Sequence, residues 1–275
     1  MRLPQRVIAV LLLTLAACNG RDGEGERLKV EEAVRRSIEA ENAGDAATFL
    51  SLWTDDGLRS YDAGTRDELS TGLVRLGAEQ TELRSFASTV VKGNRAAATI
   101  DGRVELGLYR SRFDLVRRDG GWLLDGFRFL GPTPVPAGAP VVDVTTVEYG
   151  YGLDVAALSS GDFSIRIVNQ GQEQHEISVV SMPAGTTTAE AVFALGPADG
   201  LDPATLAAGY AALGHLAYAQ PGETTTYTLA RRLEPGRYAF VCFLPVGGVN
   251  ELGRAQVPGS ETHVARGMLT PFTVG

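Results

Sequence analysis

Four side chains in the C-terminal half of this sequence could together hold a metal ion. Cys242 ends an apolar run, His263 and Met268 follow it with the spacing H-x4-M, and His175 follows an earlier apolar run. A thiolate, two imidazoles and a weak axial thioether are the donors of mononuclear copper sites that transfer electrons. Zinc is the alternative for a Cys/His2 donor set, but the methionine favours copper.

The sequence around these residues resembles that of the cupredoxins. Residues 169–175 fit the pattern N-x-G-x3-H, residues 238–242 fit Y-x-F-x-C, and residues 263–268 fit H-x4-M. The resemblance implies that the four side chains named above bind one copper ion, which would serve electron transfer or copper handling. It also implies that Asn169 ties down the loop that carries the first histidine.

The chain departs from this family in one place. Small cupredoxins have the second histidine a few residues after the cysteine, whereas here residues 246–262 separate Pro245 from His263. Such a loop can still return His263 to Cys242, because the entropic cost of loop closure grows slowly with length. It can equally hold His263 away. The alternative is a metal-free sandwich in which Cys242 is a small buried apolar residue.

The elements that must position these residues are β-strands. Alternating apolar and polar residues predict β-strands over residues 141–275, with a helical insertion within residues 187–219. The resemblance implies that these strands form an all-β Greek-key cupredoxin-like sandwich. Residues 203–216 predict a short helix in the insertion, and we interpret His215 on it as a surface or packing residue. The expected strands are 141–147, 152–158, 162–169, 175–181, 224–229, 238–243 and 269–274.

Residues 28–130 predict a separate α+β domain. Helical patterns cover residues 28–43, the segment after the capping residue Asp45, and a segment from Asp67 through three leucines. A hairpin turn at residues 101–102 is expected between the second and third strands. The expected strands are 81–91, 95–100, 104–116 and 122–130. Three helices before four sequential strands predict helices packed on an antiparallel sheet.

Two phrases in this domain, AENAGDAATFLSLWTDD and YRSRFDLVRRDGGWLLDGFRF, resemble the NTF2-like (SnoaL-like) superfamily. The resemblance implies a curved sheet that forms a conical pocket with three helices, used for catalysis in some members and for binding in many. Tyr61, Asp62 and Asp125 could line such a pocket, or they are surface residues. Trp53 and Trp122 are expected in the core. No catalytic residue is assigned.

The N-terminus has the pattern of an export signal. Arg2 and Arg6 precede an apolar run, residues 7–17, that is short for a membrane span, and Leu-Ala-Ala precedes Cys18. This resembles a bacterial lipoprotein signal, with residues 1–17 removed and lipid on the Cys18 thiol. The protein would then be extracytoplasmic and lipid-anchored to the bacterial cell membrane. An ordinary secretory signal and a retained membrane helix are the alternatives.

Two segments of biased composition mark the expected boundaries. Residues 18–27 are polar and glycine-rich and predict a flexible tether. Residues 131–140 are rich in proline, glycine and alanine and predict a semi-rigid linker. The expected folded domains are therefore residues 28–130 and 141–275.

The charge of the chain narrows the classes of partner. With 25 basic and 33 acidic residues the net charge is −8, which argues against nucleic acid and anionic lipid. Lipid on Cys18 would leave Cys242 without a disulfide partner, and either metal ligation or burial would explain that thiol. The first hypothesis is a copper-binding lipoprotein with a redox or envelope protein partner. A metal-free lipoprotein that binds a ligand or protein is the second, and enzyme action is the weakest, because no acid/base pair is identifiable.

Overall fold

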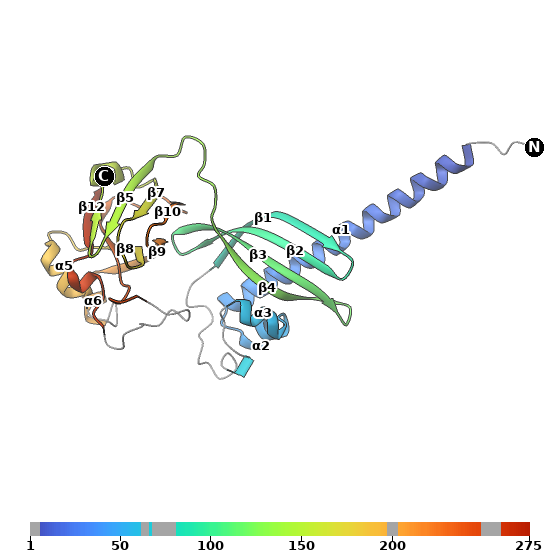
Figure 1. The fold of residues 1–275 in the computed structure, drawn as a ribbon, viewed down its shortest axis with the longest axis horizontal. Coiled ribbons are helices and arrows are strands. Elements are labelled where there is room, and N and C mark those ends of the chain that lie inside the picture. The colour runs from blue at the N-terminus through green and yellow to red at the C-terminus, as the bar shows by residue number, and fades with distance from the viewer. Residues whose placement is uncertain (1–5, 62–65, 68–80, 197–202, 249–259) are drawn as a thin grey trace, which may run out of the picture. The chain divides into compact units, whose positions relative to one another are not determined.

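The computed structural model describes residues 6–61, 66–67, 81–196, 203–248 and 260–275, which are mostly β-strand with few helices (Figure 1). The chain forms two compact units. The first consists of residues 1–102 and 110–130, and the second of residues 103–109 and 131–275.

The first unit is a four-stranded sheet with a long helix along one face (Figure 1). The strands lie side by side in chain order, and short turns join consecutive strands, as in an antiparallel meander. Along β2, buried residues alternate with more exposed ones, and the buried apolar side chains of the sheet form one core with those of the helices. The elements are α1 Arg6–Asn42, α2 Ala46–Ser51, α3 Asp55–Ser60, β1 Thr81–Lys92, β2 Arg95–Val104, β3 Gly107–Arg118 and β4 Gly121–Pro132.

Helix α1 begins well before the predicted helix at residues 28–43. The segment 18–27, expected to be a flexible tether, is helical. Pairs three residues apart stabilise this turn of the helix, among them Glu26 with Lys29 at 2.8 Å. Glu26 also accepts a hydrogen bond from the Trp122 indole at 3.0 Å, so this part of α1 is attached to the sheet. No helix in the described part of the chain is both long and apolar enough to span a bilayer.

The helix caps of the first unit follow from short polar side chains. Asp45 caps α2 as predicted and accepts a hydrogen bond from the Thr48 amide at 3.0 Å. Thr54 caps α3 in the same way, through the Gly57 amide at 3.0 Å. The third predicted helix begins at Asp67. Its remaining residues, which include Leu69, Leu73 and Leu76, lie outside the described part of the chain.

The turn predicted at residues 101–102 is wrong. Strand β2 continues to Val104, and the chain reverses at Glu105, whose φ of 51° is left-handed. Asp101 remains in the strand because its carboxylate accepts two hydrogen bonds from the Arg110 guanidinium of β3, at 2.6 and 2.8 Å. The hairpin turn therefore lies at residues 105–106 rather than at the dipeptide Asp-Gly, where a cross-strand ion pair is found instead.

The second unit contains two four-stranded sheets. Their strand orders are β10-β7-β5-β6 and β12-β11-β8-β9, and only β5 and β7 pair in parallel among the described pairings. Buried aliphatic and aromatic side chains from both sheets form one core. The strands are β5 Val141–Val147, β6 Gly150–Gly152, β7 Ser164–Asn169, β8 His175–Ser181, β9 Ala211–Ala219, β10 Thr224–Thr228, β11 Gly236–Val241 and β12 Leu269–Val274.

Two predictions for this unit are wrong. Residues 152–158, expected as a strand, form the end of β6 and a short 3-10 helix, η1 Val155–Leu158, capped by Asp154. The helix predicted at 203–216 stops early: α6 is Pro203–Ala207, and β9 begins at Ala211. This segment is a strand rather than a helix because pairing with β8 buries Leu216 and two alanines of β9. The insertion also contains helix α5, Thr188–Leu195.

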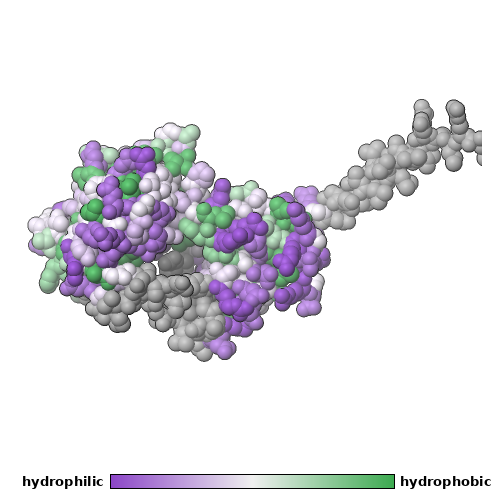
Figure 2. Space-filling view, viewed as in Figure 1, coloured by the Kyte–Doolittle hydropathy of each residue, from purple (hydrophilic) through white to green (hydrophobic). Residues whose placement is uncertain are grey.

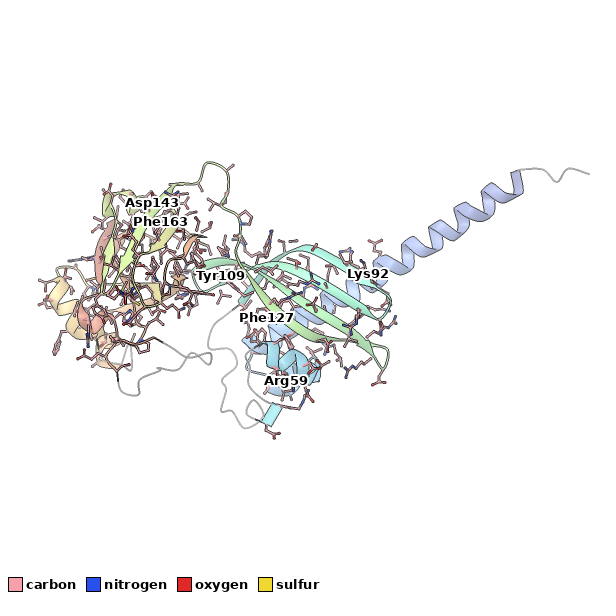
Figure 3. All side chains as sticks on the ribbon, in the orientation of Figure 1. Arg59, Lys92, Tyr109, Phe127, Asp143 and Phe163 are labelled. Carbon is pink, nitrogen blue, oxygen red and sulfur yellow. The ribbon has the colours of Figure 1, made fainter. Side chains whose placement is uncertain are left out.

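Residues 103–109 belong to the second unit, although the sequence places them in the first domain. Leu106 is fully buried in the core of the second unit. Its amide donates to the His215 carbonyl at 3.2 Å, and its carbonyl accepts from the Ala230 amide at 2.8 Å. Tyr109, labelled in Figure 3, donates its hydroxyl to the Leu216 carbonyl at 3.1 Å.

Candidate metal centre

The structure brings three of the predicted ligands together in the second unit. His175 begins β8, Cys242 follows β11, and His263 precedes the 3-10 helix η2, Val264–Arg266. The His263 Nδ1 lies 3.2 Å from the His175 Nδ1 and 3.3 Å from the Cys242 Sγ. All three side chains are buried, and their donor atoms lie within 4.8 Å of one another.

These spacings fit a single metal ion. Donors that lie ~2.0–2.3 Å from a tetrahedral ion are about 3.3–3.5 Å from one another. Two of the three donor separations, 3.2 and 3.3 Å, are close to that range, and the third is within 4.8 Å. The donor set of imidazole and thiol suits copper or zinc rather than magnesium or calcium. The buried residues present therefore fit the copper ion that the sequence implies.

The long loop before His263 returns that histidine to the cysteine. Its two ends pair: Pro245 bridges Thr262, and the Val246 amide donates to the Glu261 carbonyl at 2.8 Å. The next backbone bonds run from the His263 amide to Leu244 at 2.8 Å and from Val264 to Cys242 at 2.9 Å. These bonds close the loop at its base, so its length does not separate the ligands.

Met268 lies in the turn that connects His263 to β12. Its amide donates to the His263 carbonyl at 3.0 Å, and its own carbonyl accepts from the Cys242 amide at 3.2 Å. Gly267 between them has a left-handed φ of 99°, which completes the turn. Met268 is fully buried, and its backbone is hydrogen-bonded to both His263 and Cys242.

The loop that carries His175 is held by a buried asparagine, as the resemblance implied. Asn169 donates to the carbonyls of Glu173 at 2.8 Å and Ala219 at 3.0 Å, and accepts from the Gly171 amide at 2.9 Å. A Cβ on Gly171 would lie only 2.8 Å from the His175 Nε2. Glycine is therefore required where the backbone passes the imidazole.

The buried environment sets the protonation of the ligands. Burial lowers the pKa of His175 to about 4, and the neighbouring His263 ring adds to this shift. A neutral imidazole, which can donate a lone pair to a metal, is thus favoured at neutral pH. Burial also raises the pKa of the Cys242 thiol, and the Glu176 carboxylate adds to that effect. A cation is needed to favour the thiolate here.

Glutamate residues that no sequence motif had indicated surround the candidate ligands. The Glu176 amide donates to the Cys242 sulfur at 3.5 Å. Glu173 Oε2 lies 3.0 Å from the Nε2 of His263, whereas the Nε2 of His175 is buried without a hydrogen-bond partner, 3.8 Å from Glu148. The only sequence signal for these carboxylates was their place beside the strand ends that carry the ligands.

The remaining histidine, His215, lies outside this cluster. His215 is on β9, with its Nδ1 3.6 Å from the Glu176 carboxylate, and burial lowers its pKa to about 4. Its partly exposed side chain packs on the Tyr218 ring, which agrees with a packing role.

An aromatic ring also covers His263. The Tyr149 ring meets the His263 ring edge-on at 5.3 Å, and the Arg266 guanidinium lies over the Tyr149 ring.

The polar candidates of the first unit do not form a comparable constellation. The Tyr61 hydroxyl donates to Glu41 at 2.6 Å, and its ring packs on Trp53. Asp125 accepts from the Thr54 hydroxyl at 2.7 Å and borders a hollow of about 650 Å³ on the sheet. Asp62 lies outside the described residues. Trp53 and Trp122 are buried in the core, as predicted.

On the face seen in Figure 2, hydrophilic and hydrophobic residues are interspersed over both units. The most exposed large apolar side chain among the described residues is Phe193 of α5, which is 88% exposed. Single exposed apolar residues are normal on a protein surface and do not define a site.

Comparisons with known proteins concern the fold alone. No protein-family model matches the sequence, and no curated protein matches it. Solved structures of NTF2-like proteins are similar to part of the chain. One from Shewanella baltica is 12% identical over 40% of this chain and 96% of its own, with a TM-score of 0.31. Another, from Novosphingobium aromaticivorans, is 17% identical over 43% of this chain and 88% of its own, with a TM-score of 0.31.

Auracyanins are also among the similar structures. Auracyanin B is 23% identical over 52% of this chain and 92% of its own, with a TM-score of 0.29. The auracyanin of Roseiflexus castenholzii is 18% identical over 51% of this chain and 99% of its own, with a TM-score of 0.27. The structural neighbours thus include NTF2-like and cupredoxin folds, at identities and TM-scores that carry no inference about function.

Proposed function

We propose that the second unit binds one copper ion through His175, Cys242 and His263, with Met268 as a weak fourth ligand, and transfers single electrons. The observation that carries the proposal is the convergence of two imidazole Nδ1 atoms and one thiol sulfur in a buried space, with contacts of 3.2 and 3.3 Å. Neutral imidazole and thiolate are the ligands that serve both oxidation states of copper.

The residues of this centre have separate roles in the proposal. His175 is neutral because it is buried, so it offers a lone pair without first losing a proton. Cys242 gives up its thiol proton when the metal binds, and copper supplies the one-electron redox chemistry. Asn169 and the paired base of the long loop hold both histidines in place, which limits the reorganisation that electron transfer requires.

The proposal extends to the architecture and location of the protein. We assign to the second unit the Greek-key order of strand connections that the cupredoxins have. The chain is exported and anchored to the bacterial membrane through lipid on Cys18, with a redox protein of the cell envelope as its partner. An exported location also fits Cys242, which metal ligation would protect from oxidation and wrong pairing.

Copper(II) titration of the chain from Gly20 onward tests the central claim, because Cys242 is then its single thiol. An intense thiolate-to-copper absorption band at one equivalent, absent from Cys242→Ala, is the expected result. Electron paramagnetic resonance then reports the copper(II) environment. No band, or one that the substitution leaves unchanged, would favour the second hypothesis, a metal-free binding protein. Binding of zinc with no stable copper complex would contradict electron transfer.

A further inference from the structure

A carboxylate lies against the edge of the His263 ring that faces away from the other ligands. Glu173 Oε2 is 3.0 Å from the His263 Nε2, while the Nδ1 of the same ring lies near Cys242 and His175. The imidazole is fully buried, and the Glu173 side chain is 23% exposed. The pair is thus largely shielded from solvent, where a charge-assisted hydrogen bond is strong.

Glu173 is fixed at both its side chain and its backbone. The same Oε2 accepts a second hydrogen bond, from the Gly247 amide at 2.8 Å. The Glu173 carbonyl accepts from the Asn169 amide group at 2.8 Å, and its own amide donates to Glu148 at 3.0 Å. The loop that leads to His175 therefore also presents a carboxylate to the second histidine.

This geometry determines which nitrogen of His263 carries the proton. An ionised carboxylate only accepts hydrogen bonds, so the His263 Nε2 donates to Glu173. In the neutral ring the Nδ1 is then left with a free lone pair, and it faces the Cys242 sulfur and the His175 Nδ1 at 3.3 and 3.2 Å. A histidine ligand is commonly oriented in this way by a carboxylate on its other nitrogen.

We propose that Glu173 is a positioning residue that holds His263 in the Nε2–H tautomer, so that Nδ1 is the metal donor. Its negative charge and hydrogen bond also make the imidazole a stronger donor, which stabilises copper(II) relative to copper(I) and lowers the reduction potential. The effect on the potential rests on the copper function proposed above, whereas the tautomer is a property of the metal-free protein.

Glu148 offers a matched control for Glu173. Its Oε1 lies 3.8 Å from the His175 Nε2, beyond hydrogen-bond distance, and accepts from the backbone amides of Gln172 and Glu173. Glu148→Gln removes one negative charge near a ligand histidine, as Glu173→Gln does, without removing a carboxylate bonded to the ring. A comparison of the two separates the loss of a charge that is hydrogen-bonded to the ring from the loss of a charge that is only near a ring.

Nitrogen-15 spectra of the imidazoles in the metal-free full chain test the tautomer. His263 is expected as the Nε2–H form in the wild type and in Glu148→Gln, and as a mixture of forms in Glu173→Ala. Glu173→Gln keeps an acceptor and is expected to preserve the Nε2–H form. This variant therefore still tests the proposal if the alanine variant does not fold. A wild-type His263 protonated at Nδ1, or an unchanged tautomer in a folded Glu173→Ala, would overturn the proposal.

Copper loading then tests the consequence for the metal. Glu173→Gln is expected to raise the reduction potential more than Glu148→Gln, and Glu173→Ala to bind copper about 10- to 100-fold more weakly. Equal potentials in the two glutamine variants would overturn the claim that a carboxylate bonded to the ring lowers the potential more than a nearby one does. A wild-type Nε2–H tautomer in a protein that binds no copper would refute the copper function and leave the positioning role standing.

Discussion

At the scale of single residues, type and spacing were enough to find the residues of the candidate metal centre but not the groups that support them. Cysteine and histidine are rare in this chain, so the motif residues Cys242, His175 and His263 could be selected from the sequence. Glu173 could not, because the chain has 33 acidic residues and no motif distinguishes one of them. Its contact with the His263 ring depends on the folded loop.

Gly171 provides a first prediction at this scale. Gly171→Ala places a methyl group 2.8 Å from the His175 Nε2 and 2.5 Å from Glu148, which neither the buried ring nor the bonded carboxylate accommodates without a shift. We expect a loss of about 1–3 kcal/mol in the free energy of unfolding of the second unit and weaker copper binding. Gly150→Ala is the control, since its Cβ would meet only Val147 at 3.7 Å. Equal urea midpoints for the two variants would refute the steric argument.

The pH dependence of stability follows from two histidines, the fully buried His175 and the partly buried His215. Burial lowers the pKa of His175 and of His215 to about 4, so between pH ~6.5 and ~4 the unfolded chain binds protons that the folded chain does not. The metal-free second unit should therefore lose stability as the pH falls through this range, by up to about 3 kcal/mol for His175 and by less for the partly exposed His215.

Urea unfolding at a series of pH values, followed by near-ultraviolet circular dichroism, measures this slope. His175→Gln and His215→Gln should each make it shallower. Fluorescence of Trp53 and Trp122 reports the first unit, which contains no histidine and serves as an internal reference. A slope that neither substitution changes would show that other groups cause it.

At the scale of elements, β5, β8 and β12 were predicted with their observed bounds, and β7 begins two residues after the predicted start at residue 162. Failures occurred where tertiary pairing overrides a local preference. The alanine-rich segment of β9 has the composition of a helix, yet it pairs with β8 along its length. Asp101-Gly102 resembles a hairpin turn, but the ion pair with Arg110 keeps β2 extended.

The turn that carries His263 depends on one buried hydroxyl. Thr262 Oγ1 donates to the Gly196 carbonyl at the end of α5 at 2.9 Å and accepts from the Ala265 amide at 3.3 Å. Thr262→Val keeps the shape but leaves the carbonyl and the amide without this partner, which costs about 1–3 kcal/mol. Hydrogen exchange of residues 263–268 should become faster while β7 is unchanged. Thr224→Val, at an exposed residue of β10, serves as the control, and unchanged exchange in Thr262→Val would contradict this role.

At the scale of the whole molecule, the sequence order suggested a clean division at the Pro-rich linker, and the structure is less simple. Residues 103–109 precede the linker but belong to the second unit, with Leu106 fully buried there. No local pattern could predict this, because an apolar residue at a hairpin tip has no period to follow. The consequence is that residues 141–275 alone do not contain the complete core of the second unit.

Leu106→Ala tests this division in the chain from Gly20 onward. Removing a fully buried leucine side chain should destabilise the second unit by about 2–5 kcal/mol, whereas Leu130→Ala, at a residue that is 51% exposed, should have little effect. Two probes separate the units, because both tryptophans lie in the first and the buried Cys242 thiol lies in the second. Reaction of that thiol should begin at lower urea in Leu106→Ala, while the tryptophan transition stays in place. A shift of the tryptophan transition alone would assign Leu106 to the core of the first unit instead.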